Sequence, residues 1–251
     1  PGVSACDDCV YEKAAALLKE AEDDGTFIRE ETPCYYLYEL TMEGRRQTGV
    51  VVCASVDDYV NGVIKKHENT RADKEEDRVR HVEACGAQTG PIFLACRSFA
   101  GIAGLLAEIK NEEPLYDFVS PDGIGHRVWR IGGSERIRAV TEGFAAMPAL
   151  YIADGHHRAA SAVRAALKRR EANPGYTGEE EFNYFLSVIF CAGELRIFDY
   201  NRVVRDLNGL TPGGFLQRLE EKCRVTGCGR KAVRPQGKGE MGLYLDGSWY
   251  H

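Results

Sequence analysis

The sequence predicts an α+β fold in which a mixed β-sheet is flanked by helices. Helical and strand-like segments follow one another along the 251 residues without the strict strand-helix-strand repeat of a purely parallel sheet. Two pairs of strand-like segments are joined by short turns, which favours antiparallel hairpins. With 44% hydrophobic residues, a chain of this length has enough apolar side chains for a full core.

The helices are predicted from apolar residues that recur on one side of a segment and charged residues on the other side. Residues 11–23 show this pattern, and Gly25 ends the segment. Ser55 is the expected N-cap of the second helix, and a cap-like Thr70 precedes the third. The predicted helices cover residues 11–23, 55–66, a stretch after Thr70 that includes residues 75–78, and residues 102–110, 134–145, 159–170 and 215–223.

The strands are predicted from alternating patterns and short apolar runs that lie between turn residues. Glu43-Gly44 forms the turn of the first hairpin, and Pro121-Asp122-Gly123 forms the turn of the second. The predicted strands cover residues 35–40, 48–54, 91–96, 116–119, 126–131, 149–153, 182–190 and 195–200, and a final hairpin covers residues 241–250.

The domain organisation follows from the same pattern. We expect residues 1–251 to form a single α+β core, since no internal repeat or low-complexity tract divides the chain. The sequence opens without a first strand of its own and stops on a strand-like segment. We therefore expect a fragment of a longer protein that lacks N-terminal and C-terminal segments.

Composition excludes two classes of partner. The chain has 38 acidic and 32 basic side chains, a net charge of -6 and a sequence pI of about 5.6. A general nucleic-acid binder needs an excess of Lys and Arg to displace counterions, so we expect no nucleic-acid partner. No apolar run approaches the roughly 18 residues of a membrane span, so we expect no membrane partner. The oligomeric state is left open.

The nine cysteines predict a cytoplasmic location. Their number is odd and their spacing is irregular, so most are expected to be small buried thiols in a reducing compartment. Cys6 and Cys9 form a CxxC pair, which is compatible with a redox site or half of a zinc site. No second pair completes four ligands, and two free thiols near the terminus are the preferred interpretation.

Residues 154–158 carry the strongest functional signal, because the predicted strand 149–153 leads directly into Asp154-Gly155-His156-His157-Arg158 and then a long helix. The start of a helix has unpaired N–H groups and the positive end of the dipole. Gly155 permits a tight turn there, and Arg158 adds a guanidinium. This combination predicts an anion site suited to phosphate. The alternative is that Asp154 is only an N-cap and the histidines lie on the surface.

A second polar cluster runs from His67 to Arg78. A carboxylate at Glu68 with nearby cations is typical of a base that activates a hydroxyl beside a phosphate donor. The charge-rich part, which includes Lys74, is also explained by a solvated helix face. A metal site is a rival interpretation of His67 and Glu68, but they lack the HExxH spacing of zinc sites. Metal ligands are therefore unknown at this stage.

A third polar pair, Asn201-Arg202, follows the predicted strand 195–200. It is a candidate for binding a substrate carboxylate in the same cleft, with a surface arginine as the alternative. Neither a Walker loop nor a Rossmann fingerprint occurs in the sequence, so any nucleotide would be held by another kind of phosphate-binding turn.

Three of these segments resemble the family called domain of unknown function 1015 (DUF1015). The resemblance covers nearly the whole chain, and the three motifs occur in the same order. They are Ile64-Lys65-Lys66-His67-Glu68-Asn69-Thr70 with Lys74 and Asp77-Arg78 behind it, Tyr151-Ile152-Ala153-Asp154-Gly155-His156-His157-Arg158, and Asp199-Tyr200-Asn201-Arg202-Val203-Val204.

That family is similar to the ParB and sulfiredoxin-like superfamily, which holds nucleotide phosphates at a turn before a helix and includes kinases of free L-serine. The resemblance implies transfer of phosphate from ATP, with Mg²⁺, to a small hydroxyl metabolite, free L-serine first, to give O-phospho-L-serine. It implies Glu68 as the base, with His67 and His156 as its catalytic partners. Residues 154–158 would bind the nucleotide, and the expected substrate-binding residues are Thr70, Lys74, Arg78, Asn201 and Arg202. The alternative is a nucleotide-binding switch of the ParB type without kinase activity.

Overall fold

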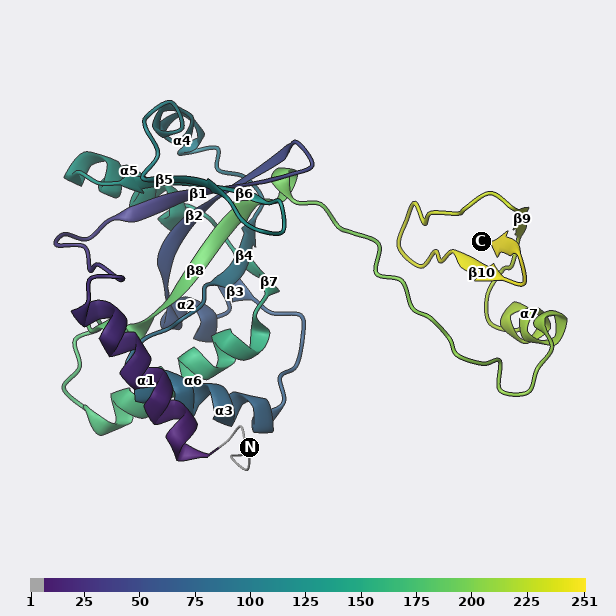
Figure 1. The fold of residues 1–251 in the computed structure, drawn as a ribbon, viewed down its shortest axis with the longest axis horizontal. Coiled ribbons are helices and arrows are strands. Elements are labelled where there is room, and N and C mark those ends of the chain that lie inside the picture. Colours follow the sequence, from purple (N-terminus) through teal and green to yellow (C-terminus); the bar gives the residue numbers. More distant parts are fainter. Residues whose placement is uncertain (1–6) are drawn as a thin grey trace. The chain divides into compact units, whose positions relative to one another are not determined.

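A computed structural model describes residues 7–251, except the side chains of residues 72–74. The chain forms two compact units, Pro1–Arg196 and Ile197–His251 (Figure 1). The prediction that residues 1–251 form one core within a longer protein stays a prediction. Across the described residues, no helix has both the length and the apolar character to cross a bilayer.

The first unit is built on one eight-stranded sheet with the strand order β3-β7-β4-β8-β2-β1-β6-β5. The pairs β3/β7 and β4/β8 are parallel and the other five pairs are antiparallel, which confirms the predicted mixed sheet. The strands are β1 (Tyr35–Met42), β2 (Arg45–Ser55), β3 (Ile64–Lys65), β4 (Ile92–Cys96), β5 (Tyr116–Val119), β6 (Gly125–Ile131), β7 (Leu150–Asp154) and β8 (Tyr184–Cys191).

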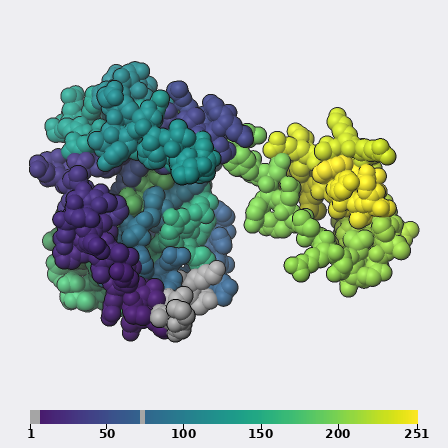
Figure 2. Space-filling model, in the orientation of Figure 1, coloured from purple at the N-terminus to yellow at the C-terminus, as the bar shows by residue number. Residues whose placement is uncertain are grey.

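Helices flank this sheet as predicted. Three of them, α1, α3 and α6, pack next to one another, and Figure 1 shows α4 and α5 at the opposite end of the unit. In Figure 2 the purple atoms of α1 cover part of the visible face of the first unit. The helices are α1 (Asp8–Asp23), α2 (Val56–Val60), α3 (Ala72–Cys85), α4 (Ala103–Ile109), α5 (Ser134–Ala145) and α6 (His156–Ala172).

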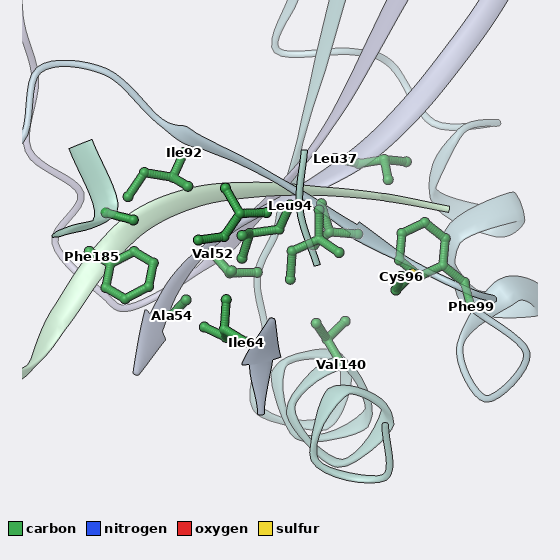
Figure 3. Packing of buried hydrophobic residues seen from close by; sticks show 14 of the residues in the cluster. Leu37, Val52, Ala54, Ile64, Ile92, Leu94, Cys96, Phe99, Val140 and Phe185 are labelled. Atoms are coloured by element: carbon green, nitrogen blue, oxygen red, sulfur yellow. The ribbon is translucent and has the colours of Figure 1, made fainter. Parts of the chain in front are cut away.

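The core fixes the position of α6 on the sheet. Leu37, Leu94 and Phe185 are among its fully buried side chains, and Figure 3 shows them against the strands of the sheet. Helix α6 contributes small residues to the same cluster, Ala159 and Ala162 among them, so its backbone can lie close to its neighbours. Its first turn is therefore held by a packed core.

The predicted helix 55–66 is wrong beyond Val60. Ser55 is the N-cap as predicted, since its hydroxyl accepts a hydrogen bond of 3.1 Å from the N–H of Asp57. Helix α2 then ends at Val60, and Gly62 has a positive φ of 73° that a helix does not allow. The residues that follow form β3, a two-residue edge strand.

The predicted strand 195–200 is also wrong. Strand β8 is followed by a 3₁₀ turn, Ala192–Glu194, and then by residues without strand pairing. Both sides of β8 are already occupied by β2 and β4, so no edge is free for the expected partner. Ile197 is accordingly 91% exposed and Tyr200 is 83% exposed.

The second unit holds α7 (Pro212–Glu220) and a small sheet of β9 (Gly227–Gly229), β10 (Leu243–Leu245) and β11 (Ser248–Tyr250). The predicted final hairpin is confirmed, and Asp246-Gly247 turns it with positive φ at both residues. Helix α7 begins three residues before its prediction, because Thr211 caps it and Pro212 occupies its first position.

The expectation of mostly buried cysteines is wrong. Of the cysteines in residues 7–251, Cys96 is buried, whereas Cys9, Cys53 and Cys223 are exposed. All of the cysteines in that range are free thiols. The CxxC interpretation lies outside the described residues, since it depends on Cys6.

Candidate functional site

The predicted strand-turn-helix at residues 154–158 is confirmed as a local structure. Strand β7 ends at Asp154, Gly155 has a φ of 91°, and α6 begins at His156. The backbone angle favours glycine, and a Cβ atom at this position would also lie 3.1 Å from the Arg158 guanidinium, a close contact that the arginine would have to relieve by shifting. The N-cap of α6 is Gly155, which has no side chain to accept a capping hydrogen bond. The N–H groups of the first turn have no partner within the helix, as in any α-helix. The alternative that Asp154 serves as the N-cap is wrong.

Arg158 is held in a defined orientation beside this turn. Its Nη2 donates a hydrogen bond of 2.8 Å to Asp154 Oδ2, and its Nη1 donates one of 2.6 Å to the Pro91 carbonyl. These contacts tie the start of α6 to the residue that precedes β4. The guanidinium is a fixed cation at the helix N-terminus, with its charge partly balanced by Asp154.

Two parallel strands bring the two predicted clusters together. Ile64 and Lys65 of β3 pair with Leu150 and Tyr151 of β7, so the residues after both strands leave the sheet at the same edge. His67 and Glu68 follow β3, and His156 follows β7. His67 and Glu68 are nearly ninety positions from His156 in the sequence, yet both contact it in the fold.

The contact joins a buried imidazole to an accessible carboxylate. His156 Nδ1 lies 3.5 Å from Glu68 Oε2, and the side chains are 5% and 59% exposed respectively. The His67 ring meets the His156 ring edge to face, with 4.5 Å between the centroids. Glu68 therefore presents its carboxylate to solvent with two imidazoles beside it.

Burial and a neighbouring histidine make His156 harder to protonate. Burial is the largest cause of a pKa below the usual 6.5, and the nearby His67 lowers the pKa further, whereas Glu68 and Asp154 oppose both effects. Two buried ring nitrogens, His156 Nε2 and His157 Nδ1, have no hydrogen-bond partner in the described part of the chain. A buried polar atom without a partner costs about 1–3 kcal/mol, so a bound ligand that supplied partners would be favoured.

The lowered pKa of His156 predicts a pH dependence of stability. The unfolded chain binds a proton at this residue as the pH falls past 6.5, whereas the folded chain resists protonation until a lower pH. Stability contributed by the neutral form is therefore lost as the pH falls below 6.5, by at most about 1.4 kcal/mol per pH unit. We expect urea unfolding to show a smaller loss below pH 6.5 in a His156→Gln variant than in the wild type. Equal losses would contradict the assignment.

The remaining predicted residues lie in several places. The Thr70 hydroxyl donates to the Glu75 carboxylate and is thus engaged within the start of α3. Arg78 and Arg158 line the same small cavity of about 50 Å³, so two predicted cations do come together. The side chain of Lys74 lies outside the described part of the structure.

Asn201 and Arg202 belong to the second unit. There the Arg202 guanidinium lies over the Tyr200 ring, 3.7 Å from its centroid. Their predicted role in binding a substrate carboxylate stays a prediction.

The sequence analysis did not predict the contacts that hold the site residues in place. The i,i+4 spacing of Asp154 and Arg158 was a usable signal for their ion pair. Ser161 links the two helices behind the site, since its hydroxyl approaches the carbonyl of Glu75 at 3.2 Å and that of His157 at 2.7 Å. The hydrogen bond from Arg158 to the Pro91 carbonyl could not be predicted, because a bond to a distant backbone carbonyl does not depend on the local sequence pattern.

The described residues contain no group of three or more His, Cys, Asp or Glu side chains placed to hold a metal ion. No curated protein and no solved structure matches this chain. A family profile, described as protein of unknown function (DUF1015), matches residues 2–251. Because that match spans almost the entire sequence, the chain belongs to the DUF1015 family.

Proposed function

We propose that this chain is a cytoplasmic phosphotransferase that uses ATP to phosphorylate a small hydroxyl metabolite, with free L-serine as the leading acceptor. The observation that carries the proposal is the 3.5 Å approach of the exposed Glu68 carboxylate to His156 at an uncapped helix N-terminus. Phosphoryl transfer needs mainly positioned N–H groups and cations at the phosphates and a carboxylate at the acceptor. The site has side chains of each kind.

The N-terminus of α6 would hold the phosphates of ATP. The N–H groups of His156 and His157 lie in its first turn, where the helix dipole favours an anion. Arg158 would add a guanidinium, and Asp154 would act by fixing that side chain. Arg78, across the shared cavity, is the second cation within this part of the site.

Mg²⁺ would supply charge neutralisation between the phosphate oxygens. Mg²⁺ is usually held by phosphates, water and one or two carboxylates. Glu68 and Asp154 are the carboxylates near the turn, and Asp154 is already paired with Arg158. Asp154 keeps one oxygen free of that bond.

At the acceptor, Glu68 would take the proton of the serine hydroxyl. The serine oxygen would bond to the γ-phosphorus as the bond between that phosphorus and the ADP oxygen breaks. Glu68 suits this step because its carboxylate is accessible, whereas His156 is buried. His156 would act as a positioning residue, since its neutral ring can direct an Nδ1–H toward Glu68 without adding a charge. Thr70, Lys74, Asn201 and Arg202 stay the predicted contacts to the amino acid.

The proposal is tested with two measurements on the same protein. Calorimetric titration with ATP and CTP establishes nucleotide binding, and chromatography detects O-phospho-L-serine after incubation with ATP, Mg²⁺ and L-serine. A kinase produces phosphoserine in proportion to enzyme. A ParB-type switch binds and slowly hydrolyses nucleotide with no response to serine. Nucleotide binding without any phosphorylated hydroxyl metabolite would refute the kinase and support the switch.

A further inference from the structure

A second cleft lies along the C-terminal half of α6, away from the turn at its N-terminus. It consists of two adjoining cavities of about 290 Å³ and about 710 Å³. They share five lining residues, Arg29, Cys53, Glu181, Tyr184 and Leu186, so they lie next to each other. Binding sites for small molecules typically have volumes of about 300–1,000 Å³. None of the residues proposed above for the kinase site lines either cavity.

The smaller cavity has an apolar wall with room for a side chain. Ala162, Ala165 and Ala166 line it from α6, and their short side chains leave space that larger residues would fill. Leu186 of β8 and Val82 of α3 complete this wall from the sheet and from the neighbouring helix. A ligand here would bury an apolar group.

Charges of both signs surround that wall. Arg29 and Arg169 line the smaller cavity, and in the described residues neither guanidinium has an ion pair or a hydrogen bond. Glu181 lines both cavities and Glu179 lines the larger one, again with no ion pair between either carboxylate and a described residue.

Charged residues next to these in the sequence do have partners within the protein. Arg170 is paired with Asp57 at 2.7 Å, and Glu180 accepts hydrogen bonds from the backbone of Thr177 and Gly178. Among the charged residues that line the cleft, Arg29, Arg169, Glu179 and Glu181 have no ion pair with a described residue, whereas Glu30 is paired with Arg130 at 2.9 Å. A cleft lined by two guanidinium groups and by carboxylates is the complement of a molecule that itself carries both charges.

We infer that this cleft binds a small zwitterion with an apolar body, that is, a free apolar amino acid. The carboxylate of the ligand lies at Arg29 and Arg169, its ammonium group lies at Glu181, and its side chain packs on the alanines of α6. The cleft is separate from the acceptor position beside Glu68, and the inference does not depend on the proposed kinase reaction.

Cys53 provides a direct reading of occupancy, because this exposed thiol lines both cavities. We expect L-leucine, L-methionine, L-phenylalanine or L-tryptophan to slow its alkylation by iodoacetamide in a saturable way, as measured by mass spectrometry of peptides. Cys9 and Cys223 are exposed thiols that line neither cavity and serve as internal controls. Equal slowing at all three thiols would signal an effect on the reagent and would count against the cleft. If none of the four amino acids protects Cys53 up to about 10 mM, the inference is overturned.

Variants and ligand fragments test the two charged ends. For the amino acid that binds best, Arg169→Gln and Glu181→Gln are each expected to weaken binding about tenfold in calorimetry. The matched control is Arg138→Gln, which replaces an exposed arginine that has a 4.0 Å contact to Glu142, and it should leave binding unchanged.

Ligand fragments separate the two charged ends. For L-phenylalanine, the fragments are 3-phenylpropanoate and 2-phenylethylamine. Arg169→Gln should weaken only the first fragment and Glu181→Gln only the second. Binding that ignores both substitutions would overturn the inference even if Cys53 were protected.

Discussion

Replacement of Glu68 by Gln is expected to lower the rate of phosphoserine formation by about 10²- to 10⁴-fold, which is the usual contribution of a general base. The amide keeps the size of the carboxylate but cannot take the hydroxyl proton. Because the proposal puts Glu68 at the acceptor and not at the phosphates of ATP, the affinity for ATP in calorimetry should change little. The loss should therefore be seen in kcat.

Two companion variants separate this effect from a general loss of structure. Glu171→Gln removes an exposed carboxylate near the other end of α6 and should retain the wild-type rate. His156→Gln removes the positioning ring that lies 3.5 Å from Glu68, so it should reduce kcat less than Glu68→Gln and change the pH profile of the rate. A Glu68→Gln enzyme with full turnover would remove Glu68 from the reaction, whatever its stability.

The site shows how far sequence reasoning reached. Residues 154–158 were placed correctly at a strand-turn-helix, because a glycine between an apolar run and a long helical pattern is a strong local signal. His67 and Glu68 were expected at the end of a helix, whereas they follow β3. Ile64-Lys65 is too short for a periodic pattern, and its strand character exists only through pairing with β7. The pairing that joins the two clusters was thus invisible in the local sequence.

Strand order explains the other large error in the fold. Residues 195–200 have a strand-like pattern, yet β8 already lies between β2 and β4. The strands β4 and β8 pair in parallel and are far apart in the sequence, so no hairpin turn in the sequence could predict their pairing. Local patterns located most elements of the first unit, and the missing information was which strands were neighbours.

Replacement of Lys110 by Met is expected to lower the free energy of unfolding by about 3–5 kcal/mol, because it leaves the buried carboxylate of Glu39 without its principal partner. Glu39 is 1% exposed on β1, and Lys110 Nζ lies 2.6 Å from its Oε2. The Thr48 hydroxyl donates to the same oxygen at 3.2 Å. Arg46 and Arg127 remain 3.8 and 4.0 Å from Oε1, which accepts no hydrogen bond from any described residue. Neither arginine can therefore replace the lysine without moving.

Urea unfolding of four proteins tests this assignment: the wild type, Lys110→Met, Glu39→Gln and the double variant. If the cost of Lys110→Met comes from an unpaired buried charge, adding Glu39→Gln removes that charge and should restore more than half of the lost stability. If the cost comes from lost packing of the lysine stem, the two effects add and the double variant is the least stable of the four. Restored stability in the double variant would show that Lys110 neutralises the buried carboxylate of Glu39. The sheet buries this carboxylate because β1 pairs with both β2 and β6, which places Glu39 opposite Thr48 and Arg127.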